Sequence, residues 1–130
     1  MVQEQYVDFE TAKILKEKGF RAKCNRYYNA QYDMIRTVSD TFMMDFNDEE
    51  YTKSIGMDGA VNIPTQQMAM RWLREKHHMF IGVGFNVEGN SYNYYISHNA
   101  IRLDDIRGHS FYSYENACDA AIKYCLENLI

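Results

Sequence analysis

The chain has 130 residues, of which 46% are hydrophobic and 25% are charged, and these values predict one globular domain over residues 1–130 that folds without metal or disulfide support. No stretch reaches the ~20 apolar residues of a membrane span, and the N-terminal residues lack the pattern of a signal peptide, so we expect a cytoplasmic protein with no membrane partner. A total of 14 Lys and Arg against 18 Asp and Glu gives a net charge of −4, which argues against a surface that follows nucleic acid phosphates throughout.

Three segments have the 3.6-residue spacing of amphipathic helices. Each follows a residue that favours a helix start, namely Asp8, Pro64 or Ser113, because Asp and Ser cap free amides and Pro fits the first turn. The first segment also stops at Gly19, a common helix terminator. The predicted helices cover residues 9–18, residues after Pro64 to near His77, and residues 114–128.

The segment after the second helix has the two-residue period of a strand, with apolar residues at odd positions from Ile81 to Val87. Gly89-Asn90 predicts a two-residue turn into a second strand. Because a one-residue slip would put the paired apolar side chains on opposite faces, the register is constrained. It pairs Val87 with Tyr92, Phe85 with Tyr94 and Val83 with Ile96, and it sets Tyr95 against Gly84 and His98 opposite Ile81.

The remaining segments have weaker patterns. A second hairpin is predicted to join residues 26–28 to residues 32–35 across Asn29-Ala30-Gln31. Residues 40–60 mix acids, apolar residues and two glycines, so we expect a long loop or a short irregular element there. Residues 102–112 contain Asp, Gly and Ser that interrupt any period, and they are also predicted to be a loop.

The order of these elements is helix, hairpin, loop, helix, hairpin, helix. Helices grouped against hairpins predict an α+β fold, a two-layer sandwich of three helices on an antiparallel sheet in the order α-β-β-loop-α-β-β-α. Nothing in the sequence has the strand-helix alternation of a parallel sheet.

The helical segments are similar to a known group of sequences. The relevant stretches are Asp8-Phe9-Glu10-Thr11-Ala12-Lys13 through Gly19-Phe20, Pro64-Thr65-Gln66 with Trp72-Leu73-Arg74-Glu75-Lys76-His77, and the Ser113-Tyr114-Glu115 helix ending in Leu129-Ile130. They resemble a family of short uncharacterised proteins from gut bacteria and their phages or integrated elements. The resemblance implies an α+β accessory protein of a bacterium or its mobile DNA, and it implies no catalytic residues.

The cysteines and histidines are expected to be structural. Cys118 and Cys125 are seven residues apart on a helix, roughly 10 Å along its axis, which exceeds the ~7 Å limit for a disulfide, so we expect reduced thiols. His77 and His78 point in directions about 100° apart, which does not make a same-face metal pair, and we expect them to cap the helix end. We therefore predict no catalytic, cofactor or metal site.

A small hydrolase is the first alternative. His109 has Asp104 and Asp105 nearby in sequence, which could supply an imidazole and a carboxylate for general base catalysis. Cys24 lies between Lys23 and Arg26, and positive neighbours can lower the pKa of a thiol and make it a nucleophile.

Nucleic acid binding is the second alternative, through the basic residues of segments 18–36 and 71–78. The neighbouring acidic segment 40–58 balances the first of these. The hairpin tyrosines could stack bases, but a stacking platform normally has interleaved cations, and residues 79–101 contain no Lys or Arg. Nucleic acid is therefore not the expected partner.

The favoured hypothesis is a noncatalytic protein-interaction module. Its predicted binding residues are Tyr95 on the hairpin and Arg71, Arg74 and His78 along one exposed stripe of the second helix. The partner is another protein or a second copy of the chain, since the hairpin can leave an open edge strand and so allow a homodimer.

Overall fold

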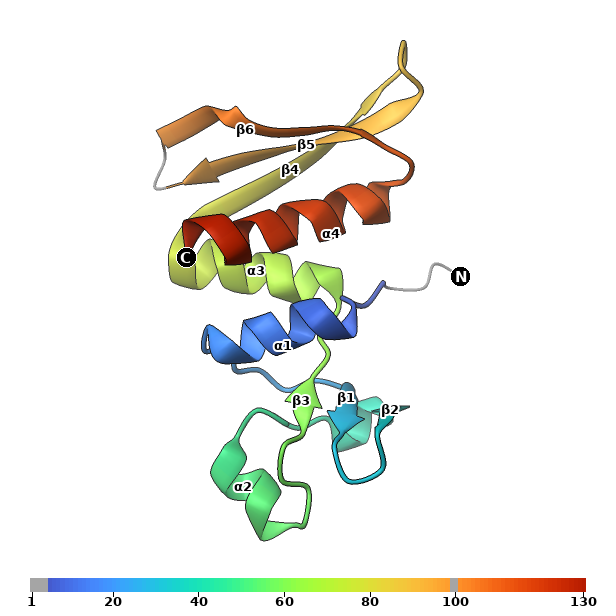
Figure 1. The fold of residues 1–130 in the computed structure, drawn as a ribbon, viewed down its shortest axis with the longest axis vertical. Helices are drawn as coiled ribbons and strands as arrows, with labels where there is room; N and C mark the ends of the chain where they lie inside the picture. The colour runs from blue at the N-terminus through green and yellow to red at the C-terminus, as the bar shows by residue number, and fades with distance from the viewer. Residues whose placement is uncertain (1–4, 99–100) are drawn as a thin grey trace. The chain divides into compact units, whose positions relative to one another are not determined.

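The structure is a computed structural model that describes residues 5–98 and 101–130, with no side-chain description for residues 101–106. In the described part of the chain the fold is α+β, as predicted, with four α-helices and two three-stranded antiparallel sheets (Figure 1). The chain divides into two compact units. We call residues 6–65 the N-terminal unit, and Gln5 with residues 66–130 the C-terminal unit.

The N-terminal unit begins with helix α1 (Phe9–Glu17). As predicted, Asp8 caps this helix, since its Oδ1 accepts a hydrogen bond from the Thr11 amide at 2.8 Å. Gly19 follows at a φ of 92°, a conformation that favours glycine. The unit's sheet has the order β2-β1-β3, from β1 (Arg26–Asn29), β2 (Met34–Thr37) and β3 (Val61–Asn62).

The segment predicted as a loop or irregular element at 40–60 contains a 3₁₀ turn (Asp40–Phe42) and the short helix α2 (Glu49–Ser54). Asp48 begins α2 by accepting a hydrogen bond from the Tyr51 amide. Phe46, ahead of α2, is buried and stacks on Tyr27 of β1 with ring centroids 4.0 Å apart. The segment therefore supplies part of the small core beneath β1.

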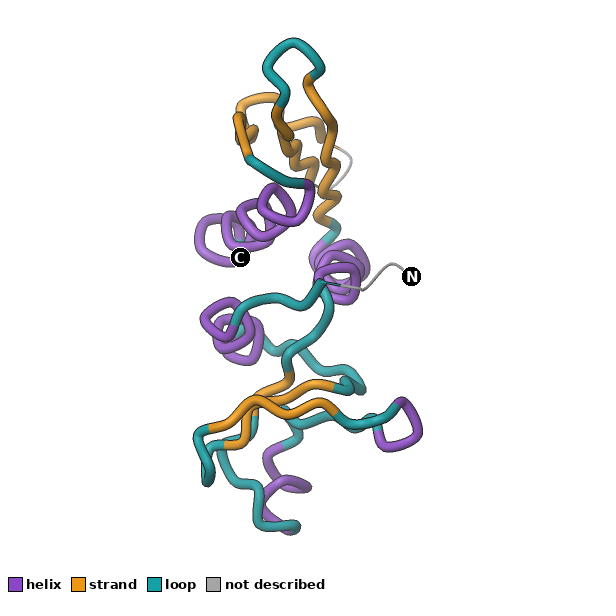
Figure 2. The backbone as a smooth tube through the Cα atoms, turned by 90° about the vertical axis from the view of Figure 1, so that its right-hand side faces the viewer, coloured by secondary structure: helices purple, strands orange, loops and turns teal. Residues whose placement is uncertain are grey.

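The C-terminal unit contains α3 (Gln66–His77), the strands β4 (Met79–Asn86), β5 (Ser91–His98) and β6 (Ile101–Phe111), and α4 (Tyr114–Tyr124). A π-helical turn, Cys125–Leu129, extends α4. Helices α3 and α4 agree with the predicted helices. Helix α4 packs along one face of the sheet, where Met79, Tyr94 and Ile96 are buried (Figures 1 and 2).

The prediction of a loop at 102–112 is wrong, because this segment forms β6 beside β5. Two register shifts interrupt the pairing, so the strand has no regular two-residue alternation that could be recognised in the sequence. Gly108 lies opposite Tyr94, where a Cβ would overlap the Tyr94 ring. The glycine that suggested a loop is thus required by close packing within a sheet.

The hairpin of β4 and β5 is confirmed, but its predicted register is wrong by two residues. Phe85 pairs with Tyr92, Val83 with Tyr94, Ile81 with Ile96 and Met79 with His98. The loop has four residues because Asn86 Oδ1 accepts hydrogen bonds from the Glu88 and Gly89 amides at 3.1 and 3.2 Å. An even shift keeps every side chain on its predicted face.

The hairpin of β1 and β2 is also confirmed, with later strand ends than predicted. Asn29 pairs with Met34 across a four-residue loop, 30–33. Asn29 Oδ1 accepts a hydrogen bond from the Gln31 amide at 3.0 Å. Asp33, the last residue of the loop, takes the left-handed conformation, with a φ of 50°.

Candidate interaction surfaces

The binding residues predicted on the second helix lie on the exposed side of α3 or directly after its end. Arg71 Nε donates a hydrogen bond to Glu75 Oε1 at 3.0 Å, one turn along the helix. Arg74 is exposed, and His78 follows the helix end in the left-handed conformation, with a φ of 53°. These residues share α3 and its end, whereas Tyr95 lies on the sheet, so the four predicted residues belong to two surfaces.

The surroundings of His77 disfavour the charged helix cap that we expected. Its ring is half-buried and meets the edge of Trp72 with centroids 4.7 Å apart. Burial, followed by the nearby His98 and His78, lowers the pKa of His77. The neutral imidazole is therefore favoured, and the backbone of His78 provides the helix termination.

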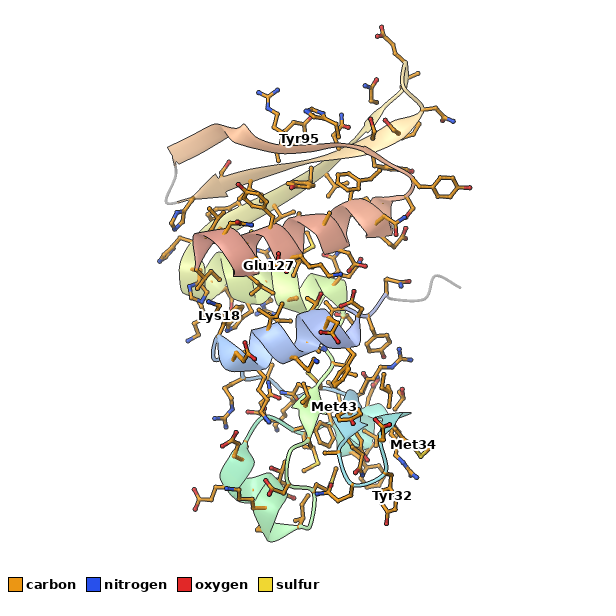
Figure 3. The ribbon with its side chains drawn as sticks, in the orientation of Figure 1. Lys18, Tyr32, Met34, Met43, Tyr95 and Glu127 are labelled. Atoms are coloured by element: carbon orange, nitrogen blue, oxygen red, sulfur yellow. The ribbon has the colours of Figure 1, made fainter. Side chains whose placement is uncertain are left out.

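Tyr95 lies in the central strand β5, on the sheet face opposite α4 (Figure 3). Its ring covers two glycines of β4, since a Cβ at Gly84 would lie 3.8 Å from the ring and one at Gly82 would lie 4.0 Å from it. The Arg107 guanidinium of β6 lies over the ring, 5.9 Å from its centroid. Tyr95 is 43% exposed, so it remains accessible to a ligand.

Strand alternation places further residues on this surface, which we call the outer sheet face. Phe80 is exposed and lies on β4, where it pairs with Ser97. No described element of the C-terminal unit covers this face (Figures 1 and 2). The described residues on the outer sheet face include Phe80, Gly82, Gly84, Asn93, Tyr95, Ser97 and Arg107.

Strand β2 is a second open surface, which the sequence analysis did not single out. It forms one edge of its sheet, and all four of its residues are exposed. Tyr32 before it and Phe42 after it are 69% and 70% exposed. One sequence signal was available: Met34 and Ile35 are adjacent, so on a strand they must point to opposite faces.

The backbone of β2 offers hydrogen bonds to a further strand. The Val38 amide donates to the Asn25 carbonyl at 2.7 Å, so by antiparallel alternation the backbone groups of Val38, Arg36 and Met34 face β1. The amides and carbonyls of Ile35 and Thr37 face outward. We call this surface, from Met34 to Thr37, the β2 edge.

A buried polar network fixes the loop beneath this sheet. Asn62 of β3 accepts a hydrogen bond from the Phe46 amide at 2.6 Å and donates to Asp45 Oδ1 at 2.7 Å and to the Ala22 carbonyl at 3.2 Å. Asp45 also forms an ion pair with Arg21. These groups satisfy one another, so the acidic residue here has a structural role.

The hydrolase alternative gains no support from Cys24. Cys24 is buried, and burial, reinforced by the nearby Asp45, raises the pKa of its thiol to about 12. An activated nucleophile needs the opposite shift. Cys118 and Cys125 are also buried free thiols, which confirms the expectation of reduced cysteines in the core.

The other hydrolase residues are only partly described. His109 is exposed on β6, whereas the side chains of Asp104 and Asp105 lie outside the described residues. Among the residues whose positions are described, no group of three His, Cys, Asp or Glu side chains could hold a metal ion. Within the same residues, no helix has the length and apolar character to cross a membrane.

Comparison of the chain with models of protein families, with curated proteins and with solved structures finds no match. Two surfaces that the protein offers to a partner in its described residues are the β2 edge and the outer sheet face.

Proposed function

We propose that the protein is a noncatalytic interaction module that binds an extended segment of another protein at the β2 edge. The observation that carries this proposal is an edge strand exposed on both faces, whose outward backbone groups at Ile35 and Thr37 pair with no strand in the described part of the chain. An exposed edge strand presents backbone groups that a further strand can pair with, and Met34 and Ile35 add exposed apolar side chains to this edge. The resemblance of the helices adds the proposal of a cytoplasmic accessory protein in a bacterium or its mobile DNA.

Strand addition would give this partner both main-chain and side-chain contacts. The outward amides and carbonyls of Ile35 and Thr37 supply the hydrogen bonds. Met34 on one face and Ile35 on the other supply apolar contacts, with Tyr32 and Phe42 exposed beyond the strand ends. An extended peptide would cover apolar side chains that now face solvent.

A different protein fits this edge better than a second copy of the chain. The ladder cannot extend past Asp33, which is left-handed, and the Ser39 carbonyl already accepts from the Phe42 amide. Within these limits, the antiparallel register that pairs the outward groups of both Ile35 and Thr37 sets Ile35 of one copy against Thr37 of the other. That register puts Arg36 opposite Arg36, and like charges directly opposite each other destabilise a sheet.

Charge complementarity then sets the sequence of the partner. Arg36 is the exposed charge in the middle of the β2 edge, so an acidic residue is expected opposite it. The neighbours of that acid face Ile35 and Thr37, where β-branched residues pack well. The expected ligand is an extended segment in which an acidic residue is flanked by Val, Ile or Thr.

A displayed random-peptide library, selected on the purified protein, tests this proposal. We expect the enriched peptides to carry the acidic pattern and to bind Thr37→Pro at least about tenfold more weakly, because proline removes an outward amide without breaking the β1–β2 ladder. Thr37→Val is the matched control, since it keeps the amide. Peptide affinity is measured by fluorescence anisotropy, and circular dichroism checks the fold.

The outcomes separate the possible occupants. Arg36→Glu should make the protein prefer basic peptides over acidic ones. Enriched peptides that bind Thr37→Pro as well as they bind the original protein would overturn the proposal. A dimer detected by light scattering and lost in Thr37→Pro would replace the foreign partner by a second copy.

A further inference from the structure

We propose that two copies of the chain associate through strand β4, which is an edge strand of the sheet in the C-terminal unit. The two β4 strands pair antiparallel across a two-fold axis and join the two sheets into one sheet of six strands. We call this surface, from Met79 to Asn86, the β4 edge. The inference does not depend on the β2 edge, which belongs to the other sheet.

The length and composition of β4 set it apart from the other edge strands of the described sheets. Strand β4 has eight residues and pairs with β5 without a register shift. In contrast, β2 has four residues, β3 has two, and the pairing of β6 has two register shifts. Proteins protect exposed edges with short strands, charges, proline or bulges. Residues 79–87 contain no charge and no proline, so β4 lacks these protections and favours pairing with a further strand.

The backbone of β4 offers hydrogen bonds along this edge. Its loop to β5 has the same length and the same left-handed last residue as the β1–β2 loop. In that hairpin the backbone groups of Met34, directly after the loop, face the partner strand. By the same geometry, Asn86 and every second residue before it face β5. The amides and carbonyls of Ile81, Val83 and Phe85 face outward, and they pair with no strand in the described part of the chain.

A second copy fits the β4 edge because this edge complements itself. In the two-fold register centred on Gly82, the outward groups of Ile81 in each copy pair with those of Val83 in the other. Phe80, which is 47% exposed, then lies opposite Gly84 of the other copy, where its ring can cover bare backbone. No like charges meet, in contrast to self-pairing at the β2 edge. A foreign strand would find no charge on the β4 edge that selects it.

The same geometry limits the assembly to two copies. A two-fold contact uses the β4 edges of both copies, so it leaves none for a third copy. The opposite edge of the sheet is β6, whose register shifts disfavour regular pairing with a further strand. The expected assembly is therefore a closed dimer and not a fibre.

Sedimentation velocity of the full chain, at concentrations from about 1 µM to about 500 µM, tests the proposal. We expect a monomer–dimer equilibrium with a dissociation constant of roughly 10–100 µM, because a single pair of strands forms a small interface. Val83→Pro should weaken the dimer at least about tenfold, because proline removes an outward amide without breaking the β4–β5 ladder. Val83→Thr is the matched control, since it keeps the amide. Circular dichroism checks the fold of each variant.

A charge at the two-fold axis tests the register without proline. Gly82 is exposed, and a Cβ there would lie 4.0 Å from the Tyr95 ring, which is an ordinary contact. Gly82→Lys sets two positive charges opposite each other and should weaken the dimer at least about tenfold, as should Gly82→Glu with two negative charges. An equal mixture of these two variants should form a heterodimer. Ser97→Lys is the matched control, because it adds a charge to the same sheet face on the central strand β5.

Four results would each overturn the proposal. They are a monomer at the highest concentration, a dimer that Val83→Pro and Gly82→Lys leave unchanged, a mixture of the two Gly82 variants that stays monomeric, and a dimer that Thr37→Pro abolishes. A dimer that persists in Thr37→Pro and is lost in Gly82→Lys supports the proposal, whether or not peptides bind the β2 edge. The two proposals can therefore fail separately.

Discussion

The two hairpins of this protein have the same turn and very different surroundings. In each hairpin the first strand ends at an Asn whose side chain accepts backbone hydrogen bonds. A four-residue loop follows, and its fourth residue is in the left-handed conformation. The β4–β5 hairpin has a helix along one face, and its central strand buries Tyr94 and Ile96. In the β1–β2 hairpin, β2 is exposed on both faces.

This difference shows which features the local sequence controls and which it does not. The Asn before each loop and the Asp or Asn at its end determine the turn, because their short polar side chains can bond the local backbone. The cover of a strand depends on packing from distant segments. The β2 edge and the outer sheet face lie where that cover is missing.

The largest expected effect comes from removing one buried side chain beneath each hairpin. Phe46→Ala removes the ring stacked on Tyr27 and should lower the free energy of unfolding by about 3–5 kcal/mol. Ile96→Ala, on the helix-covered face of β5, should lower it by about 2–5 kcal/mol. Chemical denaturation measures both values.

Amide hydrogen exchange of the same two variants tests how separate the hairpins are. We expect Phe46→Ala to reduce protection mainly in β1 and β2, and Ile96→Ala to reduce it mainly in β4 and β5, because each side chain packs within its own unit. Equal loss of protection in both hairpins would contradict this expectation. It would favour instead the single cooperative domain that the chain length predicts.

The sequence predicted the elements whose ends and burial are encoded locally. Asp8 and Ser113 cap helices that begin where expected, since each side chain accepts from the amide three residues ahead. The faces of the β4–β5 hairpin were also predictable, because one of its faces is buried. The predicted contact of Tyr95 with Gly84 is present despite the register error of two residues, because that error leaves each side chain on its predicted face.

The missed features lack such local signals. Strand β6 contains irregular pairing, so its period is broken. Strand β3 has only two residues, and the burial of Asn62 depends on partners 15 to 40 residues away in sequence. Strand β2 is exposed on both faces and so has no period. The outer sheet face includes β6, and the β2 edge is β2 itself. For this reason Tyr95 could be predicted from the sequence, whereas Arg107 beside it and the β2 edge could not.

A smaller effect is expected at high pH, from one buried thiol in each unit. Burial raises the pKa of Cys24 and of Cys125 from 9.0 to about 12. In the unfolded chain these thiols ionise near pH 9.0. Their protonated form therefore contributes fully to the free energy of unfolding below that pH, and this contribution is lost as the pH rises toward 12. The expected loss is on the order of 1 kcal/mol per pH unit for each thiol.

Denaturation curves at several pH values above 9 measure this loss, and Cys24→Ala and Cys125→Ala serve as comparisons. Tyrosines also ionise in this range, so the informative quantity is the difference in slope between each variant and the original protein. Each variant should have the shallower dependence on pH. A variant with an unchanged slope would show that its thiol ionises equally in the folded and unfolded chains.

The smallest expected effect tests the shared turn. Asn90→Gly should raise the free energy of unfolding by a few tenths to about 1 kcal/mol, because glycine adopts a positive φ without strain. Asp33→Gly should gain less, since Asp33 also accepts a hydrogen bond from the Tyr28 hydroxyl at 2.6 Å. That bond raises the pKa of Tyr28, so ultraviolet titration of Asp33→Gly should find a lower Tyr28 pKa. A larger increase in the free energy of unfolding for Asp33→Gly than for Asn90→Gly would contradict this expectation. It would mean that the Tyr28 contact contributes nothing to the turn and that the two loops differ in a way that their common geometry does not explain.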